Sequence, residues 1–127
     1  MSGRLAGVAI LLVDDDEDGR DLLDFALSEA GATVITAVNA LEALEHFKAS
    51  PPSIVVTDVA MPPFDGVWLC DQIRAVAGRQ VPVVAVTALA FPRDRARIDA
   101  ANFDANLIKP YAVDELEDVI EALTSRP

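Results

Sequence analysis

Residues 8–13, Val-Ala-Ile-Leu-Leu-Val, form an uninterrupted apolar run that ends at two aspartates, Asp14 and Asp15. A short run of this kind, rich in Val, Ile and Leu, is typical of a strand buried on both faces of a helix-covered parallel sheet. The two acids would then lie at the rim of that sheet. Adjacent carboxylates repel each other, so such a pair favours a bound cation. This stretch restricts the chain to folds that bury a parallel strand and leave its carboxyl end accessible.

The rest of the chain alternates between strand-like and helix-like patterns. Apolar or β-branched runs predict four more strands, at 33–37, 53–57, 81–86 and 105–108. Apolar residues at helical spacing predict helices over 18–30, 40–47, 69–77, 92–101 and 116–123. Strands that alternate with helices form a parallel sheet with right-handed crossovers and helices on both faces. We therefore predict an α/β fold with five parallel strands.

Composition limits the possible functions. A chain of 127 residues fits one domain, so we expect residues 1–127 to form a single unit. The net charge of −11 opposes binding to nucleic acid and to anionic lipid. No apolar run reaches the roughly 18 residues of a membrane span, and the first seven residues lack the apolar centre of a signal peptide. We expect a cytoplasmic protein, whose one cysteine, Cys70, lies in the core.

Five polar residues follow the ends of the predicted strands. They are Asp14, Asp15, Asp58, Thr87 and Lys109. The carboxyl ends of parallel strands share one edge of the sheet, and ligands of open α/β sheets bind there. Although 95 positions separate the first from the last of these residues, we expect them to meet in one shallow cleft.

The chemistry of these five side chains is complementary. Three carboxylates suit a hard divalent cation such as Mg²⁺, which prefers oxygen ligands. Lys109 can pair with a carboxylate or a phosphoryl oxygen, and Thr87 can donate its hydroxyl to an oxyanion. A carboxylate in such surroundings can attack phosphorus and become an acyl phosphate, and Asp58 is the candidate nucleophile.

In combination, five short motifs resemble the receiver domain of two-component response regulators, a CheY-like fold. The motifs are Asp14-Asp15, Asp58-Val59-Ala60-Met61-Pro62, Asp65-Gly66, Thr87-Ala88 and Lys109-Pro110. The likeness runs from about residue 8 to 124. It implies a doubly wound, flavodoxin-like sheet with strand order 2-1-3-4-5, and it implies phosphorylation of Asp58 by a histidine kinase or a histidine phosphotransfer protein.

The resemblance also assigns roles to single residues. Asp14 and Asp15 match the metal-binding acids of the family, with Asp58 and the backbone carbonyl of Ala60 completing a Mg²⁺ site. Thr87 and Lys109 match the switch hydroxyl and the phosphate-binding lysine, and the Lys109–Pro110 peptide bond is expected to be cis. Such a domain phosphorylates and dephosphorylates itself but does not turn over external substrates. Its output passes through protein partners, at helix four and the last strand and helix, or through phosphoryl relay.

One position departs from the family. Three residues before the lysine the family commonly has Tyr or Phe, and this chain has Asn106. We hypothesise that a signal passes instead through the loop after Thr87 and the helix at 92–101. That helix carries Arg93, Arg95 and Arg97, which form either a solvated face or a docking surface for an acidic partner.

Three other functions compete with the phosphorylation switch. A receiver-like module could signal without phosphorylation, which Asn106 favours and the full set of acids opposes. A general Mg²⁺-dependent phosphatase would need a substrate pocket, for which the chain has no insertion. A calcium-binding loop starting at Asp14 fails, because its twelfth position is Phe25 and a strand precedes it. Asp16, Glu17 and Asp18 are interpreted as the acidic start of a helix.

Overall fold

The computed structural model describes residues 3–88 and 92–125, in which five strands alternate with five helices. The predicted elements are confirmed in number, type and order. Their bounds are β1 (Ala9–Val13), α1 (Glu17–Glu29), β2 (Thr33–Ala37), α2 (Ala40–Ala49), β3 (Ile54–Asp58), α3 (Gly66–Ala77), β4 (Val83–Thr87), α4 (Pro92–Ala100), β5 (Ala105–Ile108) and α5 (Val113–Thr124).

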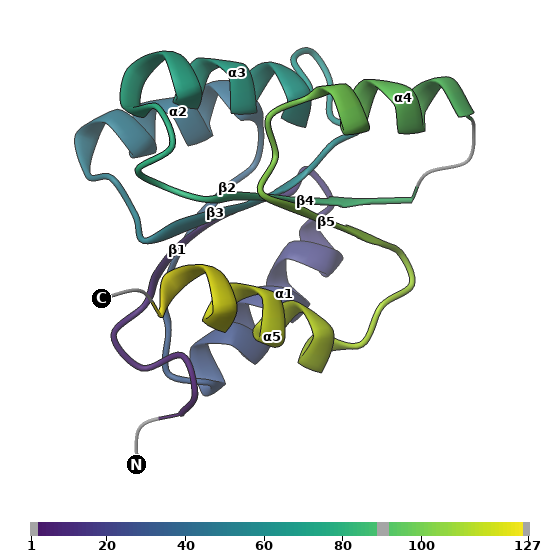
Figure 1. Cartoon of the computed structure of the whole chain (residues 1–127). Helices are drawn as coiled ribbons and strands as arrows, with labels where there is room; N and C mark the ends of the chain where they lie inside the picture. The colour runs from purple at the N-terminus through teal and green to yellow at the C-terminus, as the bar shows by residue number, and fades with distance from the viewer. Residues whose placement is uncertain (1–2, 89–91, 126–127) are drawn as a thin grey trace.

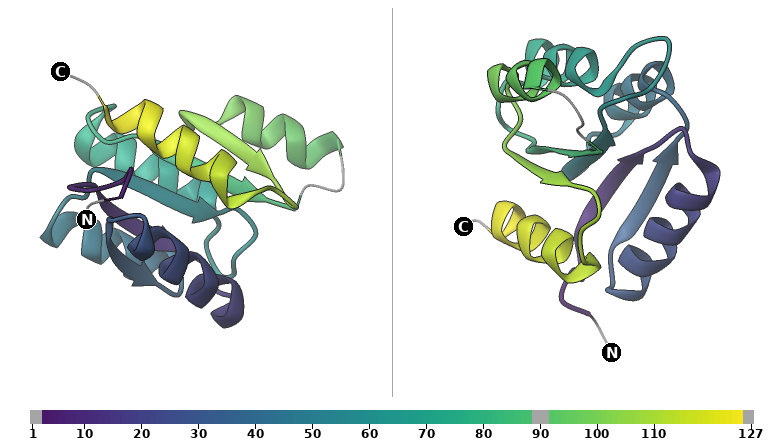
Figure 2. Two further views of the ribbon diagram at one scale, coloured as in Figure 1. Left: turned by 90° about the horizontal axis from the view of Figure 1, so that it is seen from below. Right: turned by 90° about the vertical axis from the view of Figure 1, so that its right-hand side faces the viewer.

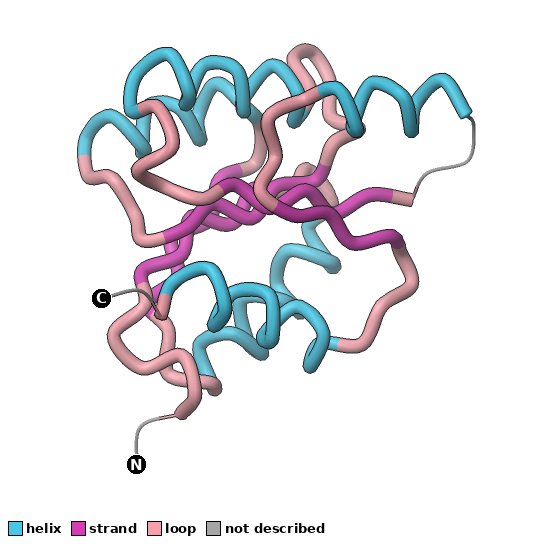
Figure 3. The backbone as a smooth tube through the Cα atoms, viewed as in Figure 1, coloured by secondary structure: helices cyan, strands magenta, loops and turns pink. Residues whose placement is uncertain are grey.

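The strands form one parallel sheet in the order β2-β1-β3-β4-β5. Helices α2, α3 and α4 cover one face of this sheet, and α1 and α5 cover the other (Figure 1). The two views of Figure 2 and the tube of Figure 3 show the strands as the middle of three layers. The predicted doubly wound fold and its strand order are therefore confirmed.

Alternation of side chains along the strands divides the core into two halves. In β1, Leu11 and Val13 pack with residues of α2 and α3, whereas Ile10 and Leu12 pack with residues of α1 and α5. All four side chains are at most 2% exposed. A strand buried on both faces needs apolar residues at every position, which explains the uninterrupted run at 8–13. Cys70 is buried in the α2–α3 half, as predicted.

Several element bounds shift by one to three residues from the sequence prediction, and two of these shifts have a clear physical cause. Strand β4 begins at Val83 rather than Val81, because Pro82 has no N–H to donate, although its carbonyl still accepts from Val55. Helix α3 begins at Gly66, three residues before its first apolar stripe residue. Asp65 caps it by accepting from the Trp68 N–H at 2.9 Å.

The helices of the described segments are short and mixed in polarity. None of them is long enough and apolar enough to cross a membrane.

Candidate functional site

The carboxyl edge of the sheet brings together the five residues singled out by sequence. Asp14 directly follows β1, Asp58 and Thr87 are the last residues of β3 and β4, and Lys109 directly follows β5. The register aligns these ends, since Val13 pairs with Thr57 and Thr87 pairs with Ile108. The predicted convergence is therefore observed, and its cause is the parallel sheet.

Three carboxylates form the centre of the site. Asp14, Asp15 and Asp58 each place one oxygen so that the three atoms lie within 4.8 Å of one another. Asp14 is buried, Asp58 is half-buried and Asp15 is exposed. Magnesium binds oxygen at about 2.0–2.1 Å, so two opposite ligands lie roughly 4.2 Å apart. The three oxygens are close enough to one another to share one cation, and the exposed Asp15 leaves the site open to the waters that Mg²⁺ usually keeps.

The Asp58 carboxylate already has a cation beside it. Lys109 places its Nζ 3.1 Å from Asp58 Oδ2, and the Ala60 N–H donates to Asp58 Oδ1 at 3.3 Å. The Lys109 N–H donates to the backbone carbonyl of Thr87 at 2.8 Å, which ties β5 to β4 at this edge. The Lys109–Pro110 bond is cis, as the resemblance predicted, and the Pro62–Pro63 bond is also cis. A role for the Ala60 carbonyl as a metal ligand stays a prediction.

The Asp14 carboxyl is in surroundings that disfavour its charged form. Burial raises the pKa of this carboxyl, and the nearby Asp58 charge raises it further, while the Asp16 N–H and Lys109 act in the opposite direction. Burial also raises the pKa of Tyr111, with smaller contributions from the charges of Asp14 and Asp58. A cation placed among the acids would remove this repulsion.

Sequence reasoning missed two residues of this site. Arg20 donates from Nη1 to the backbone carbonyl of Asp14 at 3.0 Å. Tyr111, with Lys109 and Asp14, lines a groove of about 350 Å³. Arg20 lies on α1 and contacts a backbone carbonyl of Asp14, so no residue spacing in the sequence indicated this contact. Tyr111 follows Lys109-Pro110, and no local pattern pointed to it.

The loop after Asp58 is fixed by a close backbone contact. Gly66 donates its N–H to the carbonyl of Val59 at 2.9 Å, and a Cβ at this position would lie 2.4 Å from the carbonyl oxygen of Asp58. Only glycine allows this approach. The Asp65-Gly66 motif therefore starts α3 directly against the backbone of the candidate nucleophile.

The acidic stretch after Asp15 behaves as predicted. Asp16 caps α1 by accepting from the Gly19 N–H at 3.0 Å, and Glu17 and Asp18 lie in the first turn. The strand β1 precedes this stretch where a calcium loop of the EF-hand type would need a helix.

The arginines of α4 are not equivalent. Arg97 pairs with Asp65, with 2.5 Å between Nη2 and Oδ2. Arg95 is exposed, and the side chain of Arg93 lies outside the described residues, as does most of the loop after Thr87. Asn106 is exposed on β5. Arg97 is exposed even though it pairs with Asp65, so both the solvated face and the docking surface stay predictions for α4.

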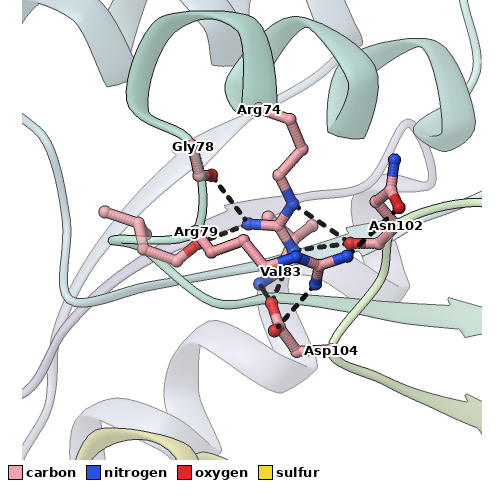
Figure 4. A network of polar contacts seen from close by, with 7 residues as sticks. Arg74, Gly78, Arg79, Val83, Asn102 and Asp104 are labelled. Atoms are coloured by element: carbon pink, nitrogen blue, oxygen red, sulfur yellow. Dashed lines mark hydrogen bonds and ion pairs between the residues drawn. The ribbon is translucent and has the colours of Figure 1, made fainter.

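A second polar network, at the opposite edge of the sheet, was not predicted. Arg74 of α3 is 10% exposed and donates to Asp104 Oδ2 at 2.6 Å and to the carbonyl of Val81 at 2.9 Å (Figure 4). Asp104 Oδ2 also accepts from the Val83 N–H at 2.8 Å, and Arg79 lies 3.5 Å from Asp104 Oδ1. The network joins α3 to the starts of β4 and β5, so its role is structural.

Residues 10–121 match the family described as "Response regulator receiver domain". The chain belongs to this family. The receiver domain is 45% identical over 114 residues to the "uncharacterized 14.6 kDa protein in sodA1 3′ region" of Leptolyngbya boryana, covering 89% of this chain and 86% of that one. It is 37% identical over 117 residues to "probable transcriptional regulator ycf27" of Cyanophora paradoxa, covering 92% of this chain and 48% of that one. This receiver domain thus spans about half the length of that regulator.

Solved structures agree with this assignment. The receiver domain of a signal transduction histidine kinase from Syntrophus aciditrophicus superposes with a TM-score of 0.89 at 29% identity, covering 94% of this chain and 91% of that chain. The response regulator TrrA of Thermotoga maritima, solved in complex with Mg(2+)-BeF, gives a TM-score of 0.81 at 31% identity, with coverages of 91% and 98%.

Proposed function

We propose that this receiver domain is a phosphorylation switch that accepts a phosphoryl group at Asp58 from a phosphohistidine donor. The observation that carries the proposal is the arrangement at the carboxyl edge, where three carboxylate oxygens lie within 4.8 Å and Lys109 Nζ lies 3.1 Å from Asp58. The solved complex of TrrA with Mg(2+)-BeF supports the choice of Mg²⁺. Asp14, Asp15, Asp58 and the Ala60 carbonyl would hold that ion.

In the proposed reaction a carboxylate oxygen of Asp58 attacks the phosphorus of the donor. A bond forms between this oxygen and phosphorus as the bond from phosphorus to the donor imidazole nitrogen breaks. The imidazole keeps the electron pair and takes up a proton from solvent. A Mg²⁺ ion held by the acidic cluster would neutralise charge on the phosphoryl oxygens. The Lys109 ammonium then pairs with a phosphoryl oxygen, and Thr87 donates its hydroxyl to another.

The phosphorylated form gains contacts that the free form lacks, so phosphorylation shifts a balance between two conformations. Partners that distinguish the two conformations receive the signal, or the phosphoryl group passes to another protein. We infer a cytoplasmic location, a sensor histidine kinase or a histidine phosphotransfer protein as donor, and no nucleic acid or membrane as partner. We also infer that residues 1–127 act as one receiver unit.

A receiver-like module that works without phosphorylation is the second candidate, because Asn106 stands on β5 where the family commonly has an aromatic residue. The two candidates differ in the chemistry of Asp58. Only the phosphorylation switch requires a carboxylate there.

Thermal unfolding in the presence of Mg²⁺ and beryllium fluoride distinguishes the phosphorylation switch from the phosphorylation-independent module. Beryllium fluoride bonded to a carboxylate has the size and charge of a phosphoryl group, so we expect it to raise Tm only when Mg²⁺ is present. Asp58→Asn should abolish the increase, while Asp21→Asn, an exposed acid of α1 outside the cluster, should retain it. An equal increase in wild type and Asp58→Asn would contradict the proposal.

A further inference from the structure

The carboxylate of Asp65 contacts both α3 and α4. Its Oδ1 accepts from the Trp68 N–H at 2.9 Å and caps α3, while its Oδ2 pairs with Arg97 Nη2 of α4 at 2.5 Å. Burial raises the pKa of the Asp65 carboxyl, but the hydrogen bonds from Trp68 and Arg97 outweigh it and the pKa lies below its ordinary value. Asp65 is therefore a charged link between α3 and α4.

Few of the described side chains of α4 are buried. Among its described side chains, residues 95–100, only Ile98 is buried, at 3% exposed. Ile98 packs with Val59 and Ala85, and Phe103 covers this cluster. On the neighbouring strand, Asn106 is exposed and contributes no apolar contact to this cluster. Among the described side chains at 95–100, Ile98 and Arg97 are therefore two that attach α4 to its neighbours.

Both attachments adjoin the candidate phosphorylation site. Asp65 precedes Gly66, which packs directly on the backbone of Asp58. Arg97 and Asp65 line a hollow of about 130 Å³ together with Thr87, the residue whose hydroxyl would bind the phosphoryl group. Movement of Thr87 toward a phosphoryl group would change the space beneath α4. A displacement of about two ångströms would lengthen the 2.5 Å contact between Arg97 and Asp65 beyond hydrogen-bonding distance.

We propose that the Arg97–Asp65 ion pair holds α4 in its unphosphorylated position and thereby opposes phosphorylation of Asp58. A contact made in only one of two states stabilises that state, and linkage requires the effect to be reciprocal. Breaking the ion pair therefore loosens α4 and speeds phosphorylation. The inference rests on the proposed function, because it assigns a regulatory element to the same site.

Two measurements on Arg97→Gln, Asp65→Asn and the double variant test this inference. Asparagine remains a good helix cap, so Asp65→Asn removes the ion pair while keeping the start of α3. Arg95→Gln is the matched control, since Arg95 is exposed on the same helix and pairs with no acid of the described segments. The first measurement is amide hydrogen exchange of α4 in the unmodified protein. The second is the rate of Mg²⁺-dependent phosphorylation by acetyl phosphate, a donor too small to dock on α4.

We expect each single variant to exchange α4 amides and to accept phosphate about two- to fivefold faster than wild type, the range for a partly exposed ion pair. The double variant should match the singles, and Arg95→Gln should match wild type. Unchanged exchange, unchanged phosphorylation, or additive effects in the double variant would overturn the inference. Failure of the wild type to accept phosphate would overturn the proposed function instead, and the exchange measurement would still decide whether the ion pair holds α4.

Discussion

Replacing Asp14 with Asn should stabilise the metal-free protein, because this carboxylate is a cost until a cation binds. Asp14 is 6% exposed, and its carboxylate belongs to a cluster whose oxygens lie within 4.8 Å. Two unit charges at that separation repel by about 0.9 kcal/mol in water and about 3.5 kcal/mol at an effective dielectric of 20. Lys109 offsets part of this repulsion. We therefore expect Asp14→Asn to raise the free energy of unfolding by about 1–2 kcal/mol.

The amide of the new side chain keeps an oxygen to accept from the Asp16 N–H, which Asp14 Oδ1 now accepts at 2.9 Å. Urea unfolding in EDTA and in Mg²⁺ checks the prediction. Saturating Mg²⁺ at ten times its Kd should add about 1.4 kcal/mol to wild type and little to Asp14→Asn. Asp21→Asn, on the exposed side of α1, should stay within about 0.5 kcal/mol of wild type in both buffers. An Asp14→Asn protein that is less stable than wild type in EDTA would refute the reasoning.

Three further predictions concern stability and reactivity. Arg74→Leu should lower the free energy of unfolding by about 3 kcal/mol, because it removes the ion-pair partner of the Asp104 carboxylate. Urea unfolding measures this loss, and a loss below about 1 kcal/mol would show that the ion pair is dispensable. The pKa of Asp65 is lower in the folded protein than its ordinary value of 3.8. The ionised Asp65 carboxylate therefore stabilises the fold by about 0.5–1 kcal/mol above pH 3.8, and this stabilisation is lost as the pH falls through the folded pKa. The stability gap between wild type and Asp65→Asn should therefore shrink from pH 7 to pH 3, and a constant gap would contradict this. Burial raises the pKa of Cys70 to about 11, so iodoacetamide at pH 8 should modify it in urea but not in the native protein; rapid native modification would exclude a buried thiol.

The fold was predictable because its determinants are local. The run at 8–13 identifies a strand buried on both faces, and five apolar or β-branched runs that alternate with helical stripes leave a parallel sheet as the simple solution. The pairing of Lys109 with Asp58, 51 residues apart, followed from topology alone. Ends of parallel strands share an edge, whatever residues lie between them.

The contacts that sequence did not reveal depend on side-chain reach across the folded molecule. Arg97 meets Asp65 only because α4 lies beside the start of α3, and Arg74 meets Asp104 only because α3 ends above β5. Neither arginine stands in a motif. Their partners lie 32 and 30 residues away in the sequence, and Asp104 is at the edge of the sheet opposite the site.

The proposed function requires Asp58 to accept a phosphoryl group with help from Mg²⁺. Intact mass after incubation with acetyl phosphate, with and without Mg²⁺, tests it most directly. We predict a gain of one phosphoryl group that requires Mg²⁺, is lost on treatment with base as an acyl phosphate must be, and is absent in Asp58→Asn. The proposed function would be contradicted if Asp58→Asn gained the same mass. It would also be contradicted if a folded wild-type protein that binds Mg²⁺ gained no phosphoryl group from either acetyl phosphate or a phosphohistidine donor.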